Sequence, residues 1–248
     1  MSTRIIILAA GKGKRMGADV PKPLVEIGGR PMVRHLLDSI EESGIDERPI
    51  LVVAPDSLEH FYDVCSDKDC DYAIQEEQLG TGHAVQAAKE KAETSEQIIV
   101  LNGDHPFITS ETIKKLTKLY KEHNPAIAMM TIKVPNFKGE YETFVGWGRV
   151  IRDEVGNLVE IKETKDATDE EKEIKELNPQ IFMFNAEWLW DHLPELKNKN
   201  ASSEYYITDL VSMAIDEGSD VVTDLAEPFE VIGINTKEEL ARAEKILA

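Results

Sequence analysis

A basic, glycine-containing segment near the amino terminus has the residue types that phosphate chemistry needs. Gly11 and Gly13 have no Cβ, so the backbone there can turn sharply and approach a ligand closely. Backbone N–H groups in such a loop can point at phosphate oxygens. Arg15 suits bidentate phosphate contacts, and Lys22 brings a point charge on a flexible side chain. The segment therefore predicts an anion site with Arg15 and Lys22 among its cations.

The elements on either side of this segment must position it. Residues 4–8 form a short, apolar, β-branched run that predicts a buried strand, and Pro31 opens a segment with apolar residues at helical spacing. In an open α/β sheet, ligands bind where such a strand ends. Two common glycine motifs are excluded, because a dinucleotide fingerprint would need glycine at Met16 and the P-loop pattern fits at neither glycine.

A second junction between a strand and a helix carries paired amides. An apolar run at 72–74 predicts a strand, and Gln75, Gln78 and Gly80 follow it before small residues predict a helix from Ala84. Each glutamine amide has donors and an acceptor, which suits it to reading the edge of a base. Gly80 permits close backbone approach, so this junction predicts a nucleoside-binding loop.

A carboxylate at an expected strand end is a candidate metal ligand. The predicted strand at 98–101 leads to Asp104, and a carboxylate at the end of a central strand is well placed to hold Mg²⁺ on phosphates. Near the end of the chain, 231–234 is expected to finish a strand, and Thr236 begins a capping-box pattern for a closing helix. Asn235 then lies between them, and an amide oxygen in general can serve as a ligand of a hard cation.

From Phe137 the sequence changes in texture. Alternating polar and apolar residues at 146–152 and 158–162 predict strands with one solvated face, with a turn at Gly156. The acidic run at 169–173 predicts a solvated helix or loop face. This region predicts a β-rich unit beside the parallel sheet that the earlier strands and helices imply.

Composition limits the classes of partner and location. The net charge is −19, which argues against a nucleic-acid partner and makes the basic cluster at residues 12–22 stand out as a local anion site. Two cysteines without further paired ligands do not predict a zinc site. No signal peptide and no apolar run long enough to span a membrane is evident, so we expect a cytoplasmic protein with no membrane partner.

The motifs in their order resemble the nucleotide-sugar pyrophosphorylases. The first segment is similar to L-x-x-G-x-G-x-R-M followed by P-K-P-L, and the paired-amide loop is similar to Q-x-x-Q-L-G-T-[AG]-H-A. Later stretches resemble G-D, G-[YF]-G-R-[IV]-x-R, E-x-K-D-A-T, E-[IV]-N-T-G, E-Y-Y-[IL]-T-D and G-[VI]-N. The resemblance covers essentially the whole chain and is strongest to the uridylyltransferase domain of bifunctional UDP-N-acetylglucosamine pyrophosphorylases.

The resemblance implies a fold, a cofactor and substrates. The expected fold is α/β, a Rossmann-like, mostly parallel sheet with helices on both faces plus a smaller mixed β lobe that binds the sugar. Residues 1–248 would form one nucleotidyltransferase domain, with a nucleotide-binding core at 1–135 and 226–248, a sugar-phosphate lobe at 136–225, and no hexapeptide-repeat domain for acetyl transfer. The substrates would be UTP and a sugar-1-phosphate, the cofactor Mg²⁺, and the oligomeric state is left open.

The resemblance also assigns the remaining site residues by motif. The nucleotide-binding residues would be Leu8, Ala9, Ala10, Gly11, Gly13, Gln75, Gln78, Gly80 and Thr81. The sugar-phosphate-binding residues would be Asn102, Gly146, Glu163, Lys165, Asn178, Tyr206 and Thr208. Asp104 and Asn235 would hold the metal, and Arg15 and Lys22 would be catalytic.

Three departures from the family pattern leave the substrate open. Asn102 stands where Tyr is common, His105 is unusual, and Pro179-Gln180 replaces Thr-Gly. Gln180 adds bulk and cannot take glycine's backbone angles freely. The expected activity is UDP-GlcNAc synthesis from UTP and N-acetylglucosamine-1-phosphate, and the alternatives are transfer to glucose-1-phosphate or another sugar, or a catalytically silent regulatory homologue.

Overall fold

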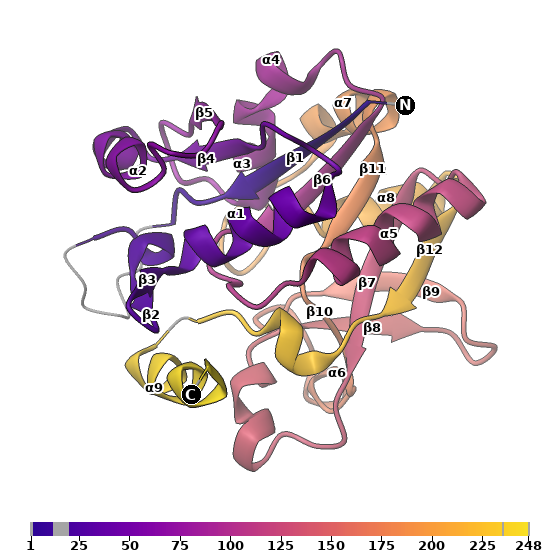
Figure 1. Cartoon of the computed structure of the whole chain (residues 1–248). Helices are drawn as coiled ribbons and strands as arrows, with labels where there is room; N and C mark the ends of the chain where they lie inside the picture. The colour runs from indigo at the N-terminus through magenta and orange to yellow at the C-terminus, as the bar shows by residue number, and fades with distance from the viewer. Residues whose placement is uncertain (1, 12–19, 235, 248) are drawn as a thin grey trace.

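A large mixed sheet forms the centre of the molecule (Figure 1). The computed structural model describes residues 2–11, 20–234 and 236–247. Within these ranges the strand order is β5-β4-β1-β6-β11-β7-β10-β8-β9, with β12 paired to β7. The strands are β1 (Thr3–Leu8), β4 (Ile50–Val53), β5 (Asp71–Ile74), β6 (Gln97–Asn102), β7 (Ile127–Lys133), β8 (Gly148–Arg152), β9 (Leu158–Lys162), β10 (Glu176–Asn178), β11 (Phe182–Asn185) and β12 (Val221–Leu225).

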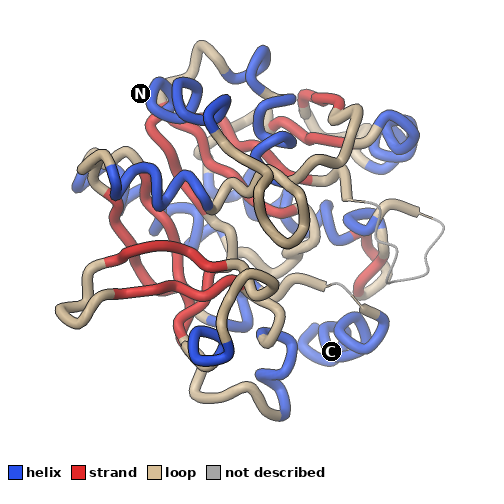
Figure 2. The backbone as a smooth tube through the Cα atoms, turned by 180° about the vertical axis from the view of Figure 1, so that it is seen from behind, coloured by secondary structure: helices blue, strands red, loops and turns tan. Residues whose placement is uncertain are grey.

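The direction of the strands divides the sheet into two parts. β5, β4, β1 and β6 run parallel, and β12 is parallel to β7. β11 is antiparallel to both of its neighbours, β6 and β7. β10, β8 and β9 continue the sheet with antiparallel pairing, and β8 and β9 extend to one side in Figure 2. A separate two-stranded sheet pairs β2 (Glu26–Ile27) with β3 (Arg30–Pro31).

Helices cover both faces of the sheet, which confirms the expected fold class. One apolar cluster packs α1 (Met32–Ser43), α2 (Leu58–Val64), α5 (Ser110–His123) and α9 (Lys237–Leu247) against one face. The other packs α3 (Thr81–Ala87), α4 (Lys89–Ala92), α7 (Ala186–His192) and α8 (Asp209–Asp216) against the opposite face. The short helix α6 (Asp169–Lys172) has no buried residue, as the acidic run predicted.

Alternation along the strands decides which face each residue meets. Ile5 and Ile7 of β1 join the first cluster, whereas Ile6 joins the second, because successive strand residues point to opposite faces. All three are fully buried, and each contributes about 1.5–3 kcal/mol relative to an exposed side chain. The buried β1 therefore fixes the position of the basic segment that follows it.

One strand that the sequence predicted is absent from its expected place. Residues 231–234 form no strand; the 3-10 helix Pro228–Val231 ends there and an irregular segment follows. The backbone N–H of Ile234 donates to the carbonyl of Asp104 at 3.1 Å, so this backbone bonds to a loop instead of to a strand. The capping box is confirmed, since Thr236 and Glu239 exchange hydrogen bonds of 3.0 and 3.1 Å.

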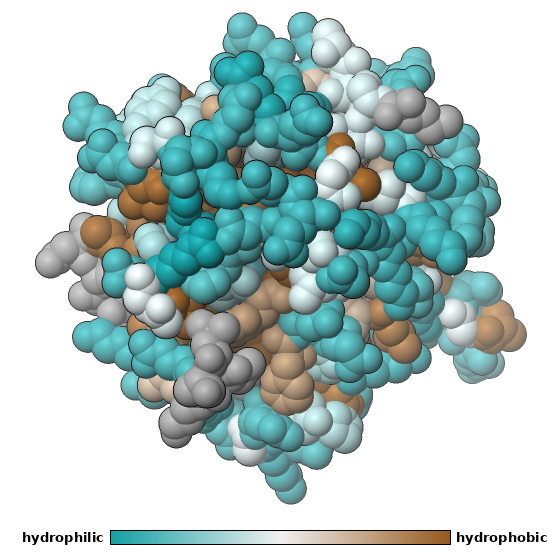
Figure 3. All heavy atoms as spheres, in the orientation of Figure 1, coloured by the Kyte–Doolittle hydropathy of each residue, from teal (hydrophilic) through white to brown (hydrophobic). Residues whose placement is uncertain are grey.

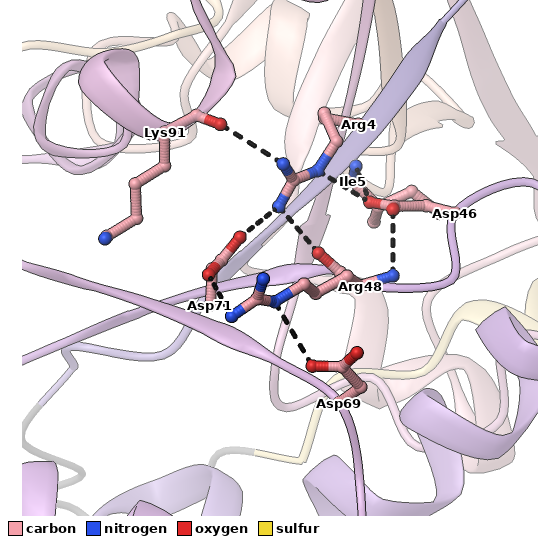
Figure 4. Close-up of polar contacts among 7 residues, drawn as sticks. All are labelled: Arg4, Ile5, Asp46, Arg48, Asp69, Asp71 and Lys91. Carbon is pink, nitrogen blue, oxygen red and sulfur yellow. Dashed lines mark hydrogen bonds and ion pairs between the residues drawn. The ribbon is translucent and has the colours of Figure 1, made fainter.

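A polar cluster holds the start of β1 to three other segments (Figure 4). The Arg4 guanidinium donates to the carbonyl of Lys91, to the carbonyl of Arg48 and to a carboxylate oxygen of Asp71. Buried Asp46 accepts from the backbone N–H groups of Ile5, at 2.7 Å, and of Arg48, at 3.0 Å. This cluster lies at the end of β1 away from the basic segment and has a structural role.

The expected division of the chain at residues 135 and 226 stays a prediction. The segment 136–225 supplies β8, β9 and β10, but it also supplies β11 and β12, which pair with the strand β7 in the large sheet. The molecule's face in Figure 3 is predominantly hydrophilic, in keeping with the net charge of −19. None of the helices in the described ranges is both long and apolar enough to cross a membrane.

Candidate active site

One cleft brings together most of the residues that the sequence singled out. It has a volume of about 590 Å³, within the range of small-molecule sites. The predicted residues that line it are Leu8, Ala10, Gly11, Lys22, Gln75, Gln78, Gly80, Thr81, Asn102, Asp104, Gly146, Glu163 and Asn178. Other predicted residues lie elsewhere: Ala9 is buried in the core, and Arg15, Gly13 and Asn235 lie outside the described residues.

The loop after β5 is held by its own glutamines. Gln75 is almost fully buried, and its Nε2 donates to the carbonyl of Gly80 at 3.1 Å. Gln78 Nε2 lies 3.4 Å from the carbonyl of Gln75. Thr81 Oγ1 accepts from the backbone N–H of Ile207 at 3.0 Å, which fixes the first residue of α3. The glutamines therefore shape the loop as well as bordering the cleft.

Gly80 is required by its conformation and by its neighbour. Its φ is +113°, a region that residues with a Cβ rarely adopt. A Cβ added there would come within 2.7 Å of the carbonyl oxygen of Tyr205 and 2.8 Å of its nitrogen. The sequence predicted close approach at Gly80, and the partner in that approach is the protein's own backbone.

A buried ion pair lies where β1 and β6 end. Lys22 Nζ donates to a carboxylate oxygen of Asp104, and both side chains are largely buried. Burial by itself would raise the pKa of Asp104, but the Lys22 ammonium and His105 outweigh it and hold that pKa below its usual value. Asp104 is therefore an anion at neutral pH. Its carboxylate holds the ammonium of Lys22, and both residues line the cleft.

His105 lies beside this ion pair. Burial lowers its pKa, and its ring is stacked with Trp147 at a centroid distance of 5.7 Å and an interplanar angle of 19°. Its Nδ1 is buried and has no hydrogen-bond partner within the part of the chain that the structure describes. His105, which follows Gly103-Asp104, thus packs between the carboxylate of Asp104 and the ring of Trp147.

A row of three residues crosses the strands β10, β8 and β9 at the other end of the cleft. Asn178 is opposite Gly148 in the β10–β8 pairing, and the β8–β9 register, continued by one residue, places Gly148 opposite Glu163. Directly opposed residues share a face of a sheet, so Gly148 forms a floor between the two polar side chains. A Cβ at Gly148 would lie 3.4 Å from Glu163 Oε1.

Glu163 and Asn178, the two polar residues of the row, differ in the hydrogen-bonding groups that they leave without a protein partner in the described ranges. Glu163 Oε1 accepts from the hydroxyl of the fully buried Thr208 at 3.2 Å, and burial raises the pKa of Glu163. Asn178 Oδ1 accepts from the backbone N–H of Gln180 at 2.9 Å. Asn178 Nδ2 is buried without a partner among the described residues. The row therefore offers a carboxylate acceptor and an amide donor, which suits a polyhydroxylated ligand.

Three sugar-side predictions lie off the cleft wall. Thr208 stands behind Glu163, as a support for its carboxylate. Lys165 is exposed and its Nζ donates to Ser202 Oγ at 2.9 Å, and Tyr206 is half-buried. Direct substrate contacts from these three residues stay predictions.

Comparison with known proteins identifies the family. The family model of the MobA-like NTP transferase domain matches residues 5–195. The chain belongs to this family. It is therefore a nucleotidyltransferase domain, as the sequence motifs predicted.

Relatives of this nucleotidyltransferase domain include longer proteins. The "Bifunctional protein GlmU" of Caldicellulosiruptor saccharolyticus is 41% identical over 98% of this chain and 51% of its own length. The protein of the same name from Clostridioides difficile is 39% identical over 100% of this chain and 52% of its own length. The chain thus spans about half the length of the curated relatives it matches.

A solved structure shares the fold of this domain. It is a putative glucose-1-phosphate thymidylyltransferase from Bacillus anthracis in complex with sucrose, with a TM-score of 0.77. It covers 99% of this chain and 95% of its own chain at 17% sequence identity. This likeness supports the fold alone.

The sequence reasoning missed several residues that line the cleft of the domain. They are Pro23, Ala84, Glu142, Thr143, Trp147, Gly148, Glu204 and Glu239. Gly148 had a usable signal, because a glycine inside a strand indicates a close approach. The sequence pattern assigned Glu239 only a role in capping a helix. Glu142 and Thr143 belong to a 3-10 helix, Gly139–Phe144, that the spacing of apolar residues did not predict.

The fit of the domain to Mg²⁺ depends on few protein ligands. No group of three metal-ligating side chains occurs among the residues that the structure describes. Mg²⁺ bound with substrate phosphates needs only one or two carboxylates, so ionised Asp104 is a suitable ligand. Asn235, the second ligand that the resemblance implies, lies outside the described residues. Among the described residues, Asp104 therefore supplies a ligand that fits the ion.

Proposed function

We propose that this chain transfers a uridylyl group from UTP to N-acetylglucosamine-1-phosphate, forming UDP-GlcNAc and releasing pyrophosphate. The observation that carries the proposal is that a single cleft joins the glutamine loop, the Lys22–Asp104 pair and the Asn178–Gly148–Glu163 row. These three parts match the needs of a base, of phosphates and of a sugar. The similarity to the GlmU proteins over nearly the whole chain supports the same assignment.

The chemistry needs positioning and charge neutralisation. The sugar-1-phosphate is already an anion at neutral pH, so its oxygen attacks the α-phosphorus of UTP in line without a general base. Lys22 and Arg15 neutralise charge on the transferred phosphoryl and on the departing pyrophosphate. Asp104 and Asn235 would hold Mg²⁺, which offsets the negative charge of both phosphates when it is bound.

The two ends of the cleft have separate roles in this proposal. The glutamine loop, with Gln75, Gln78 and Gly80, holds uracil, and Ala10 and Gly11 lie along the phosphates. The row at the other end holds the sugar: Glu163 accepts from hydroxyl groups and Asn178 Nδ2 donates to an oxygen. The nucleotide-binding core at 1–135 and 226–248, the sugar lobe at 136–225 and a cytoplasmic location are parts of the same proposal.

A pyrophosphate-release assay tests the proposal. Each of the four ribonucleoside triphosphates is combined with Mg²⁺ and either N-acetylglucosamine-1-phosphate, glucose-1-phosphate or no sugar. We expect release with UTP and N-acetylglucosamine-1-phosphate and none without sugar. Release with no combination, by a protein that still binds a UDP-sugar, would refute the enzymatic reaction and favour a regulatory binding role.

A second acceptor, glucose-1-phosphate, is favoured by one observation. Gln180 occupies a place where the family pattern has glycine, and its side chain lines the cleft. Added bulk in the sugar end favours the smaller sugar, which lacks the acetamido group. Release with UTP and glucose-1-phosphate alone would keep the chemistry and change the substrate.

A further inference from the structure

Two residues that depart from the family pattern contact each other inside the cleft. Asn102 Nδ2 donates to Gln180 Oε1 at 3.4 Å, which joins the end of β6 to the segment after β10. Both side chains line the cleft and both are partly exposed. We call this contact the amide bridge.

The amide bridge has one free acceptor and one free donor. Its internal bond uses Asn102 Nδ2 and Gln180 Oε1, so Asn102 Oδ1 and Gln180 Nε2 take no part in it. No described residue bonds to either of these two atoms. An amide-like group on a ligand has the complementary pair, one N–H donor and one carbonyl acceptor.

The backbone at Gln180 is held in a conformation that costs energy. Its φ is +57°, which non-glycine residues adopt uncommonly. The bond from its N–H to Asn178 Oδ1 at 2.9 Å keeps it there and directs the unpartnered Asn178 Nδ2 away from that bond. Strain of this kind is found at functional sites, where the surrounding structure maintains it. A glycine at this position would adopt the same φ without strain.

The position of the amide bridge indicates which part of the sugar it meets. Asn102 precedes the phosphate-side Asp104 by two residues, and Gln180 follows Asn178 of the sugar row by two residues. The bridge thus lies between the phosphate end and the sugar end of the cleft. In a hexose-1-phosphate the carbon next to the phosphate-bearing C1 is C2, and glucose and N-acetylglucosamine differ only there.

We propose that the amide bridge formed by Asn102 and Gln180 reads the C2 acetamido group of the sugar and makes these two residues determinants of sugar specificity. Gln180 Nε2 donates to the acetamido carbonyl, and Asn102 Oδ1 accepts from the acetamido N–H. This inference rests on the proposed function for its ligand class. Under this inference Gln180 favours the acetylated sugar, whereas bulk alone at this position would favour glucose-1-phosphate, and the binding comparison below distinguishes the two.

Binding of the two product nucleotides tests the inference without turnover. Isothermal titration calorimetry with Mg²⁺ compares UDP-GlcNAc with UDP-glucose for the wild-type chain, Gln180→Gly and Asn102→Ala. Two neutral hydrogen bonds at the acetamido group give an expected wild-type preference of about tenfold for UDP-GlcNAc. Each variant should reduce that preference to about threefold or less, because it loses more affinity for UDP-GlcNAc than for UDP-glucose.

A matched control separates strain relief from sugar reading. Asn124 also has a positive φ, +47°, and caps α5 outside the cleft. Asn124→Gly and Gln180→Gly should both fold, and only Gln180→Gly should change the sugar preference. An equal preference in wild type and in both cleft variants, or a wild type that binds the two nucleotides alike, would overturn the inference. A lost pyrophosphate release with the binding preference intact would instead refute the proposed reaction alone.

Discussion

Replacing Gly80 by alanine should strongly destabilise the fold, because the new Cβ would clash with the backbone of Tyr205. The backbone has φ +113° and ψ 177°, a region essentially confined to glycine, which costs about 1–3 kcal/mol for another residue. The Cβ would also lie 2.7 Å and 2.8 Å from the oxygen and nitrogen of Tyr205. Overpacking of that kind costs about 1–3 kcal/mol more.

The neighbour of Gly80 cannot easily move aside. The N–H of Tyr205 donates to the carbonyl of Leu79 at 2.8 Å, and its carbonyl accepts from the N–H of Gly82 at 2.8 Å. A shift would break one of these bonds, so we expect Gly80→Ala to lower the free energy of unfolding by about 4 kcal/mol. Urea denaturation, followed by circular dichroism, measures this.

A control variant separates the steric cost of a Cβ near Tyr205 from the cost of the positive φ. Gly218 has φ +78° and nothing within 4 Å of an added Cβ, so Gly218→Ala should lose about 1–2 kcal/mol from backbone conformation alone. If the two variants differ by less than about 1 kcal/mol, the reasoning about the Tyr205 contact is wrong.

Three further predictions concern single carboxylates. Asp104→Asn should fold and lose at least about a hundredfold in pyrophosphate release, and a near-normal rate that still depends on Mg²⁺ would contradict its role. Burial raises the pKa of Asp209 to about 6, so its ionised form opposes folding above that pH and the penalty disappears as the pH falls toward 3.8. Asp209→Asn should therefore stabilise the protein by about 1 kcal/mol at pH 7.5 and hardly at all near pH 4, as thermal unfolding at both pH values will test. Asp46→Ala leaves the N–H groups of Ile5 and Arg48 unpaired and should lower the free energy of unfolding by about 2–4 kcal/mol in urea denaturation. A loss below about 1 kcal/mol would show that these two hydrogen bonds do not stabilise the start of β1.

Local patterns in the sequence were sufficient for the parallel part of the sheet. The apolar runs at β1, β4, β5 and β6, with helical spacing between them, identify buried strands and crossover helices without long-range information. The site residues at the ends of these strands follow from the same rule, which is why Gln75 and Asp104 border one cleft.

Residues whose role depends on distant partners could not be predicted in this way. The placement of β11 between β6 and β7, the lining by Glu142 and Glu204, and the Asn102–Gln180 contact join segments far apart in the chain. The segment 231–234 reads as a strand from its apolar residues, yet its backbone bonds to the carbonyl of Asp104. Propensity cannot foresee a tertiary partner of this kind.

The strand β11 makes the two parts of the chain interdependent during folding. It is synthesised after residue 181 but pairs with β6 on one side and with β7 on the other, and both of these strands are complete by residue 133. A nascent chain that stops at residue 135 has made β6 and β7 without the strand that separates them. Until β11 emerges, those strands have unsatisfied edges that favour aggregation. Cooperative folding of the whole domain, instead of sequential folding of a core and then a lobe, is the consequence of this one insertion.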